Sequence, residues 1–197
     1  MADMKKGWIA ALLALVVAGV AAALLLRPSQ PPIPPALQTL GGDFSLQSSA
    51  GAVRLSDFHG KAVLVYFGYT HCPDACPMAL GVMAEAMRQL DAREQEKVAG
   101  IFISLDPRRD TPELLQKYAG FFDPRILGVT GSSTELAKVA ADWRVSYEVP
   151  DKPADTNYTV SHSTFIYLVN PAGKVVALFD EKTGPGEIAG TIRRWLD

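Results

Sequence analysis

The sequence predicts one α/β domain, with a mixed central sheet flanked by helices, behind a single N-terminal membrane-spanning helix. Three observations lead to this fold class. Apolar runs such as 62–69 and 98–105 alternate with segments of helical periodicity, which is typical of strands joined by helices. A predicted antiparallel strand pair near the C-terminus makes the sheet mixed. An uncharged apolar run, 7–26, precedes the domain.

The apolar run 7–26 is long enough to be a membrane anchor. About 20 apolar residues span a bilayer as a helix, whereas the apolar part of a signal peptide has about 7–15. An uncleaved anchor is therefore favoured over a cleaved signal. Lys5 and Lys6 precede the run and only Arg27 closely follows it, so the positive-inside rule places residues 1–6 in the cytoplasm. We expect a bacterial inner membrane, with the domain in the periplasm.

Residues 27–40 form a predicted proline-rich tether between the anchor and the domain, 41–197. The first nine of them contain five prolines, which favours an extended and semi-rigid chain. The formal net charge of −2 and the pI of about 5.9 argue against a nucleic-acid partner.

The first half of the domain has clear signals for a hairpin and two core strands. Segments 44–46 and 53–55 alternate in polarity and are separated by small and polar residues, which predicts a β-hairpin. The core strand 62–69 leads to a helix expected over 78–90, where apolar residues recur at spacings of three and four. A second buried strand is expected at 98–105.

The second half of the domain has two marked helix starts. Thr111 before Pro112 provides an N-cap and a first-turn proline, which predicts a helix to about residue 121. Ser132 and Glu135 form a capping box, which predicts a helix through Trp143. A short strand is expected at 126–130 and an exposed insertion at 151–157. Two strands joined by a turn are expected at 163–169 and 174–179, and a final helix at 185–196.

The only two cysteines of the chain, Cys72 and Cys76, lie at the predicted junction of a core strand and a helix. If the segment between them is helical, their Cβ atoms are about 5–6 Å apart. A disulfide needs about 3.5–4.5 Å, whereas sulfurs up to about 4.6 Å apart can share a metal ion. The spacing favours metal capture, although an oxidising compartment also permits a disulfide.

Copper is the metal that suits such a pair. Structural zinc takes four protein ligands, and this chain offers two thiols and three histidines, His59, His71 and His162. Soft thiolates at low coordination number suit Cu(I), and an added imidazole also accommodates Cu(II). We expect His59 in a turn, and His71 on the opposite strand face from Cys72. The residues alone leave the third ligand open.

Several segments resemble the SCO/SenC family of membrane-anchored copper chaperones with a thioredoxin-like fold. They occur in the order of the family and extend over essentially all of residues 41–197: 69–77 (YTHCPDACP), 104–112 (SLDPRRDTP), 122–125 with 128–131 (FDPR, GVTG) and 162–168 (HSTFIYL). The resemblance implies that Cys72, Cys76 and His162 bind one copper ion. Many relatives carry Asp before this histidine, where this chain has Ser161, so the contacts that orient His162 must differ.

The resemblance also implies a function. The protein would deliver copper to the CuA centre of cytochrome c oxidase, or reduce the cysteines of that centre, and another periplasmic copper or thiol protein is a further candidate partner. It would be primarily a metal-binding protein, with a possible thiol–disulfide reductase activity.

Two other functions remain open. The first is a periplasmic thiol–disulfide oxidoreductase that uses Cys72 and Cys76 as its catalytic redox dithiol without copper. His162 distinguishes it from a chaperone, because a reductase does not need that imidazole. The second is a thioredoxin-fold peroxidase, which needs one isolated low-pKa thiol, and nothing in the sequence singles one out.

Other side chains with ligand or catalytic chemistry have structural explanations in the sequence. The core of the domain accounts for two methionines, Met83 and Met87. Asp74 is expected to be a charge at a helix N-terminus. Three residues after the second core strand could form an ion-paired loop close to the site or cap the following helix, and caps are favoured: Asp106, Arg109 and Asp110.

Overall fold

The computed structural model describes residues 15–19, 31–150 and 157–196, which fall into two units. One unit contains the helical segment 15–19, and the other runs from Pro32 to Leu196. The predicted anchor lies mostly outside the described residues, as does nearly all of the predicted insertion. Among the described residues, no helix reaches the length and apolar character that a membrane crossing needs.

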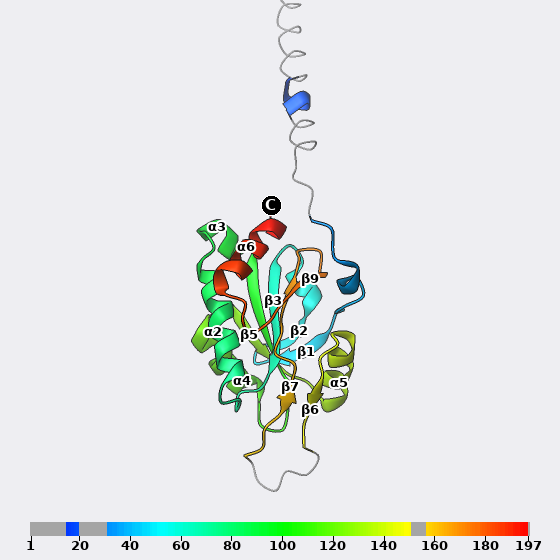
Figure 1. Cartoon of the computed structure of the whole chain (residues 1–197), viewed down its shortest axis with the longest axis vertical. Helices are drawn as coiled ribbons and strands as arrows, with labels where there is room; N and C mark the ends of the chain where they lie inside the picture. Colours follow the sequence, from blue (N-terminus) through cyan, green and yellow to red (C-terminus); the bar gives the residue numbers. More distant parts are fainter. Residues whose placement is uncertain (1–14, 20–30, 151–156, 197) are drawn as a thin grey trace, which may run out of the picture. The chain divides into compact units, whose positions relative to one another are not determined.

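The larger unit is built on a five-stranded mixed sheet with the strand order β5-β4-β3-β8-β9 (Figure 1). Three strands are parallel: β3 (Ala62–Gly68), β4 (Val98–Ser104) and β5 (Ile126–Val129). The other two, β8 (Ile166–Val169) and β9 (Val175–Phe179), run antiparallel to their neighbours. Every residue of β3 and β4 is buried, so both strands are continuous apolar runs without alternation. The predicted mixed sheet is confirmed.

Helices cover this sheet, and most of them begin where their capping residues predict. They are α2 (Ala75–Arg88), α3 (Ala92–Glu96), α4 (Pro112–Phe122), α5 (Ser133–Asp142) and α6 (Pro185–Leu196). The Thr111 side chain accepts the Leu114 N–H, and Ser132 forms the predicted capping box with Glu135. The sequence prediction missed α3, although Asp91 and Glu94 form a capping box at its start.

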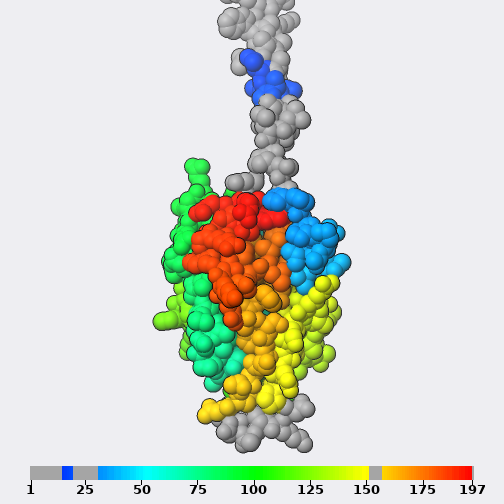
Figure 2. Space-filling view, viewed as in Figure 1, coloured from blue at the N-terminus to red at the C-terminus, as the bar shows by residue number. Residues whose placement is uncertain are grey.

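The helices bury the apolar stripes that the sequence predicts for them. Met83 and Met87 of α2 have no exposed surface, so packing explains both methionines as expected. Helix α2 packs along α6 and also contacts α4. Figure 2 shows α6 and the segment before it, in red and orange, over the middle of one face.

The N-terminal hairpin forms as predicted, but the chain before it differs from a free tether. Strands β1 (Ser45–Ser48) and β2 (Gly51–Arg54) pair antiparallel, and a 3-10 turn, η2 (Leu55–Phe58), follows. A second 3-10 turn, η1 (Pro35–Leu37), lies within the predicted tether, and Leu37 in this turn and Ile33 before it pack against the hydrophobic core. The folded unit therefore begins before residue 41.

A separate two-stranded sheet carries His162. Strands β6 (Tyr147–Glu148) and β7 (Ser161–His162) pair antiparallel, with Tyr147 opposite His162. The sequence predicted neither strand. The strand predicted at 163–169 starts only at Ile166, because residues 163–165 leave the small sheet before they join the central one.

Candidate metal centre

Three side chains with soft or borderline ligand atoms converge at the end of β3. The sulfurs of Cys72 and Cys76 and a ring nitrogen of His162 all lie within 4.8 Å of one another. The Cys76 Sγ is 3.5 Å from the His162 Nε2. Within the described part of the chain, no other group of three His, Cys, Asp or Glu residues has a metal-binding arrangement. The structure thus brings together the three residues expected to bind copper.

The two cysteines do not lie on one helix face. Cys72 lies in the loop after β3, whereas Cys76 lies in the first turn of α2, which begins at Ala75. The helical geometry that we considered for this pair is therefore wrong. The reason is Pro77, which lacks an N–H and fits a helix only in its first turn.

The loop brings the Cys72 sulfur over the start of α2 instead. The Cys76 backbone N–H, which has no partner within the helix, points at the Cys72 Sγ at 3.4 Å. Such an N–H and the positive end of the helix both stabilise negative charge on that sulfur. Both cysteines are free thiols in this structure.

The environments of the two sulfurs differ. Cys76 is fully buried, and Cys72 is half-buried. Burial raises the pKa of the Cys76 thiol well above its usual range. A Cβ atom at Gly68 would lie 2.6 Å from the Cys76 Sγ, so only glycine leaves room for this sulfur against the end of β3. Cys72 is the accessible member of the pair.

A backbone carbonyl orients His162. Its Nδ1 lies 2.9 Å from the Ser163 carbonyl oxygen, which assigns the ring proton to Nδ1 and leaves the Nε2 lone pair directed at Cys76. Ser161 is exposed and pairs with Glu148, so it does not supply this contact. The rings of Tyr66 and Tyr69 meet the imidazole edge-on, at centroid distances of 6.1 and 5.9 Å.

The other two histidines lie outside this cluster. His71 is in the turn after β3, where its Nδ1 lies 3.1 Å from the Thr70 Oγ1 and 3.7 Å from an Asp110 oxygen. The strand-face reason for leaving it out of the ligand set was wrong, because β3 ends at Gly68. His59 ends η2, as expected of a turn residue.

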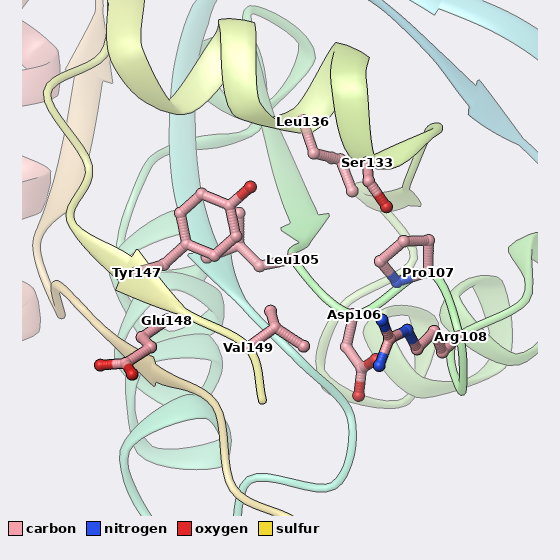
Figure 3. A pocket seen from close by; sticks show the side chains of 9 residues that line it. All are labelled: Leu105, Asp106, Pro107, Arg108, Ser133, Leu136, Tyr147, Glu148 and Val149. Carbon is pink, nitrogen blue, oxygen red and sulfur yellow. The ribbon is translucent and has the colours of Figure 1, made fainter. Parts of the chain in front are cut away.

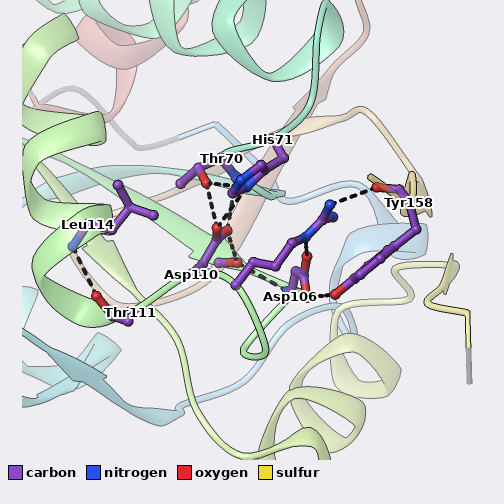
Figure 4. A network of polar contacts seen from close by, with 9 residues as sticks. Thr70, His71, Asp106, Asp110, Thr111, Leu114 and Tyr158 are labelled. Atoms are coloured by element: carbon purple, nitrogen blue, oxygen red, sulfur yellow. Dashed lines mark hydrogen bonds and ion pairs between the residues drawn. The ribbon is translucent and has the colours of Figure 1, made fainter. Parts of the chain in front are cut away.

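Two buried carboxylates hold the segments that lead into the site (Figure 4). Asp110 accepts the Thr70 N–H at 2.9 Å and the Ser104 hydroxyl at 2.6 Å, and it also accepts the Thr70 hydroxyl. It thereby ties the loop before Cys72 to the end of β4. The expectation that Asp110 caps a helix is wrong, because Thr111 caps α4.

Asp106 and Arg109 act in the same way on the segment before His162. Asp106 has no exposed surface, accepts the Tyr158 hydroxyl at 2.7 Å and pairs with the Arg109 guanidinium. Arg109 also donates to the Tyr158 carbonyl at 2.8 Å and lies 3.6 Å over the Tyr158 ring. These residues are not caps either. The contacts with Thr70 and Tyr158 link residues 40 to 52 positions apart, so no local pattern in the sequence predicts them.

Two hollows adjoin strand β6, and one of them opens beside His162. That hollow has a volume of about 570 Å³ and is bordered by Ser161, His162 and Ser163 together with 146–148. The other, of about 380 Å³, lies between β6, the start of α5 and the loop after β4 (Figure 3). Tyr147 and Glu148 line both hollows. The imidazole is therefore approachable from solvent.

This donor set suits copper. Two sulfurs and one imidazole nitrogen form a soft site of low coordination number, which fits Cu(I) and also accommodates Cu(II). The geometry does not suit structural zinc, because no fourth His, Cys or carboxylate ligand completes the cluster in the described part of the chain. The two thiols can also oxidise to a disulfide if the loop moves to close the gap between them.

Comparison with known proteins agrees with this geometry. A family model described as SCO1/SenC matches residues 34–197. Bovine (Bos taurus) "Protein SCO2 homolog, mitochondrial" is 41% identical over 157 residues, which is 79% of this chain and 59% of that protein. The chain thus spans less than two thirds of the length of that relative.

Solved structures extend the similarity to the fold. The structure of Bradyrhizobium japonicum ScoI with copper bound is 41% identical and superposes with a TM-score of 0.71, over 80% of this chain and 99% of that one. BsSco, described as a member of the Sco family of cytochrome c oxidase assembly proteins with a disulfide switch, is 26% identical with a TM-score of 0.66, over 84% and 98%. The predicted thioredoxin-like α/β fold is thereby confirmed.

Proposed function

The chain belongs to the SCO1/SenC family, and on that basis we propose that it is a copper chaperone. It takes up one copper ion on Cys72, Cys76 and His162 and passes it to another protein. The observation that carries the proposal is the convergence of these three ligand atoms within 4.8 Å, in the fold of a relative solved with copper bound. The ion is cargo, carried as Cu(I) or Cu(II).

The different burial of the three ligands suggests the order in which copper leaves. The buried Cys76 holds the ion from within, whereas Cys72 and His162 are half-buried at the rim. A thiolate of the recipient would enter from the solvent side and bind copper as the His162 Nε2 bond breaks, since a neutral imidazole is the weakest of the three donors to Cu(I). Cys72 and then Cys76 would follow, and each would regain a proton.

The proposed recipient is the CuA centre of cytochrome c oxidase. The description of BsSco as an oxidase assembly protein supports this choice. The hollow beside His162 gives a docking loop access to the ion. Another periplasmic copper or thiol protein is the alternative recipient.

The proposed location is the bacterial inner membrane. Residues 7–26 form the anchor and residues 1–6 lie in the cytoplasm. Residues 27–40, of which Ile33 and Leu37 pack on the domain, lead from the anchor to the periplasmic copper-binding domain. The length of the apolar run and the lysines before it support this arrangement.

One observation favours a second function, that of a thiol–disulfide oxidoreductase. Two free thiols lie close together, and Cys72 is accessible while Cys76 is not. That asymmetry suits a reductase in which one thiol attacks and the other resolves. His162 would then be a bystander.

The test is a copper titration of the reduced full-length chain in detergent, with Cu(I) and with Cu(II). The proposal predicts one tight copper ion per chain, which His162→Ala weakens strongly. His71→Ala is the matched control, because His71 lies beside the cysteines but outside the cluster, and it should bind as the wild type does. Equal binding by the His162 variant, or no binding by the wild type together with disulfide reductase activity, favours the second function.

A further inference from the structure

Tyr66 is a buried residue of β3 whose hydroxyl has no role in the fold. Its side chain has no exposed surface, its ring stacks on Phe102 at a centroid distance of 6.4 Å, and it meets His162 edge-on. The hydroxyl is one of two buried tyrosine hydroxyls, with that of Tyr118, that have no hydrogen-bond partner among the described residues. Because a buried donor without an acceptor is destabilising, such a group indicates a partner that another state of the protein provides.

The Cys76 sulfur lies beside this tyrosine. A single Cβ atom at Gly68 would contact both the Cys76 Sγ, at 2.6 Å, and the Tyr66 Cε1, at 3.1 Å. The Tyr66 ring and the Cys76 sulfur therefore border the same small space at the end of β3. As a neutral thiol, Cys76 does not complete a hydrogen bond with the phenol.

The Tyr66 hydroxyl is a donor without an acceptor in the described part of the chain, and the Cys76 sulfur becomes an acceptor when it carries negative charge. A thiol in apolar surroundings needs little from its neighbours, but a buried sulfur that carries negative charge needs a donor. The Cys72 sulfur has the Cys76 backbone N–H for this purpose. Of the two buried tyrosine hydroxyls without a partner among the described residues, that of Tyr66 belongs to the ring that lies beside the Cys76 sulfur.

We propose that the Tyr66 hydroxyl donates a hydrogen bond to the Cys76 sulfur once that sulfur is bound to copper. Tyr66 is then a positioning residue that tunes the metal centre without touching the ion. This inference rests on the proposed copper site. A hydrogen bond to a thiolate withdraws electron density from it, so the sulfur becomes a weaker donor and the centre favours Cu(I) over Cu(II).

The Tyr66 hydroxyl has one alternative hydrogen-bond partner, which the experiment must distinguish from the Cys76 sulfur. Tyr66 also lines a small, mostly apolar hollow of about 110 Å³ together with Met78, Thr164 and Ile166. A water molecule there could accept the phenol proton. In that case the electronic properties of bound copper would not depend on the hydroxyl.

The test compares Tyr66→Phe with Tyr118→Phe in the copper-loaded full-length chain in detergent. Both variants remove one buried hydroxyl without a partner, but the Tyr118 ring contacts Phe102 and Phe122, whereas the Tyr66 ring meets His162. In Tyr66→Phe, the sulfur-to-copper charge-transfer band of the Cu(II) form should move to longer wavelength, and the reduction potential of the bound ion should fall. Cu(I) affinity should drop roughly tenfold, the effect of one hydrogen bond to a charged group. Tyr118→Phe should change none of these properties.

A ring-fluorinated tyrosine at position 66 provides a second test, in which the band and the reduction potential should shift in the opposite direction. Its hydroxyl is a stronger donor, so the band should move to shorter wavelength and the potential should rise, even if Tyr66→Phe fails to fold. Wild-type spectra, potential and Cu(I) affinity in both position-66 variants would overturn the inference and leave the copper site intact. If the wild-type chain binds no copper, it is the proposed function that fails.

Discussion

The His162 Nε2 lies 3.5 Å from the Cys76 Sγ, although 86 residues separate the two in the sequence. The contact exists because β3 delivers the cysteine loop to the same end of the sheet at which the short strand β7 presents the imidazole. Each partner also has a fixed orientation, Cys76 from the first turn of α2 and His162 from the Ser163 carbonyl. The site is therefore largely preformed before an ion arrives.

The unequal burial of the thiols predicts unequal reactivity. In the reduced, metal-free chain, a small alkylating reagent should modify Cys72 at least roughly tenfold faster than Cys76, because Cys76 is fully buried and burial raises its pKa. Mass spectrometry of the peptides after timed quenching measures the two rates. In denaturant the rates should become similar, and equal rates in the folded chain would contradict this account of the site.

Gly68 should be intolerant of a side chain. Gly68→Ala places a methyl group 2.6 Å from the Cys76 Sγ and 3.0 Å from Phe102, so we expect a loss of about 1–3 kcal/mol in unfolding free energy and weaker copper binding. Gly81→Ala on α2 is the control, because nothing lies within 4 Å of its Cβ position, and the helix should gain up to about 1 kcal/mol. Denaturant unfolding measures both. A neutral Gly68→Ala variant would show that the packing around Cys76 is looser than described.

The contact between Tyr158 and Asp106 should act on copper through His162. Tyr158→Phe removes one hydrogen bond from a buried carboxylate, at a cost of about 1–3 kcal/mol, and loosens the segment that leads to β7. In an otherwise wild-type chain, Tyr158→Phe should weaken Cu(I) binding. In a His162→Ala background the same change should have little further effect on affinity. Additive losses in a double-mutant cycle would mean that Tyr158 acts elsewhere.

The Asp123–Arg125 pair predicts a pH-dependent contribution to stability. Burial alone would raise the pKa of the Asp123 carboxyl, but hydrogen bonds from the Arg125 side chain, at 2.7 and 2.8 Å, and from its backbone N–H outweigh burial and lower that pKa. The pair therefore stabilises the fold above the unfolded-state value of about 3.9, and this contribution is lost as the pH falls through the lower folded-state pKa.

Asp123→Asn isolates that contribution. The variant should be less stable than the wild type by about 1–3 kcal/mol at pH 7, and the difference should shrink as the pH falls below about 4. Denaturant unfolding at several pH values measures this. A stability difference that stays constant across this range would mean that the carboxylate charge contributes nothing.

The sequence predicts those features of the fold that depend on neighbours in the chain. The buried strands β3 and β4 are continuous apolar runs, and the caps at Thr111 and Ser132 are local hydrogen bonds. All four features can therefore be predicted from the sequence. The loop geometry of Cys72 was readable in principle, since Pro77 fits only the first turn of a helix. The helical geometry considered for the segment from Cys72 to Cys76 did not take Pro77 into account.

The features that the sequence does not predict all depend on contacts between distant segments. Residues alone could not choose His162 over the other histidines, because β7 is two residues long and exists only by pairing with β6. The buried roles of Asp106 and Asp110 likewise depend on Tyr158 and Thr70, which lie 52 and 40 residues away. The resemblance to a family supplied the ligand set, and the fold supplies the physical reason for it.

X-ray absorption at the copper edge of the Cu(I)-loaded, reduced chain tests the central proposal most directly. The account predicts two sulfur scatterers and one imidazole nitrogen per copper ion, with loss of the imidazole contribution in His162→Ala and its retention in His71→Ala. An imidazole signal that persists in His162→Ala, or a wild-type shell without two sulfurs, would contradict the assignment of Cys72, Cys76 and His162 as the copper site.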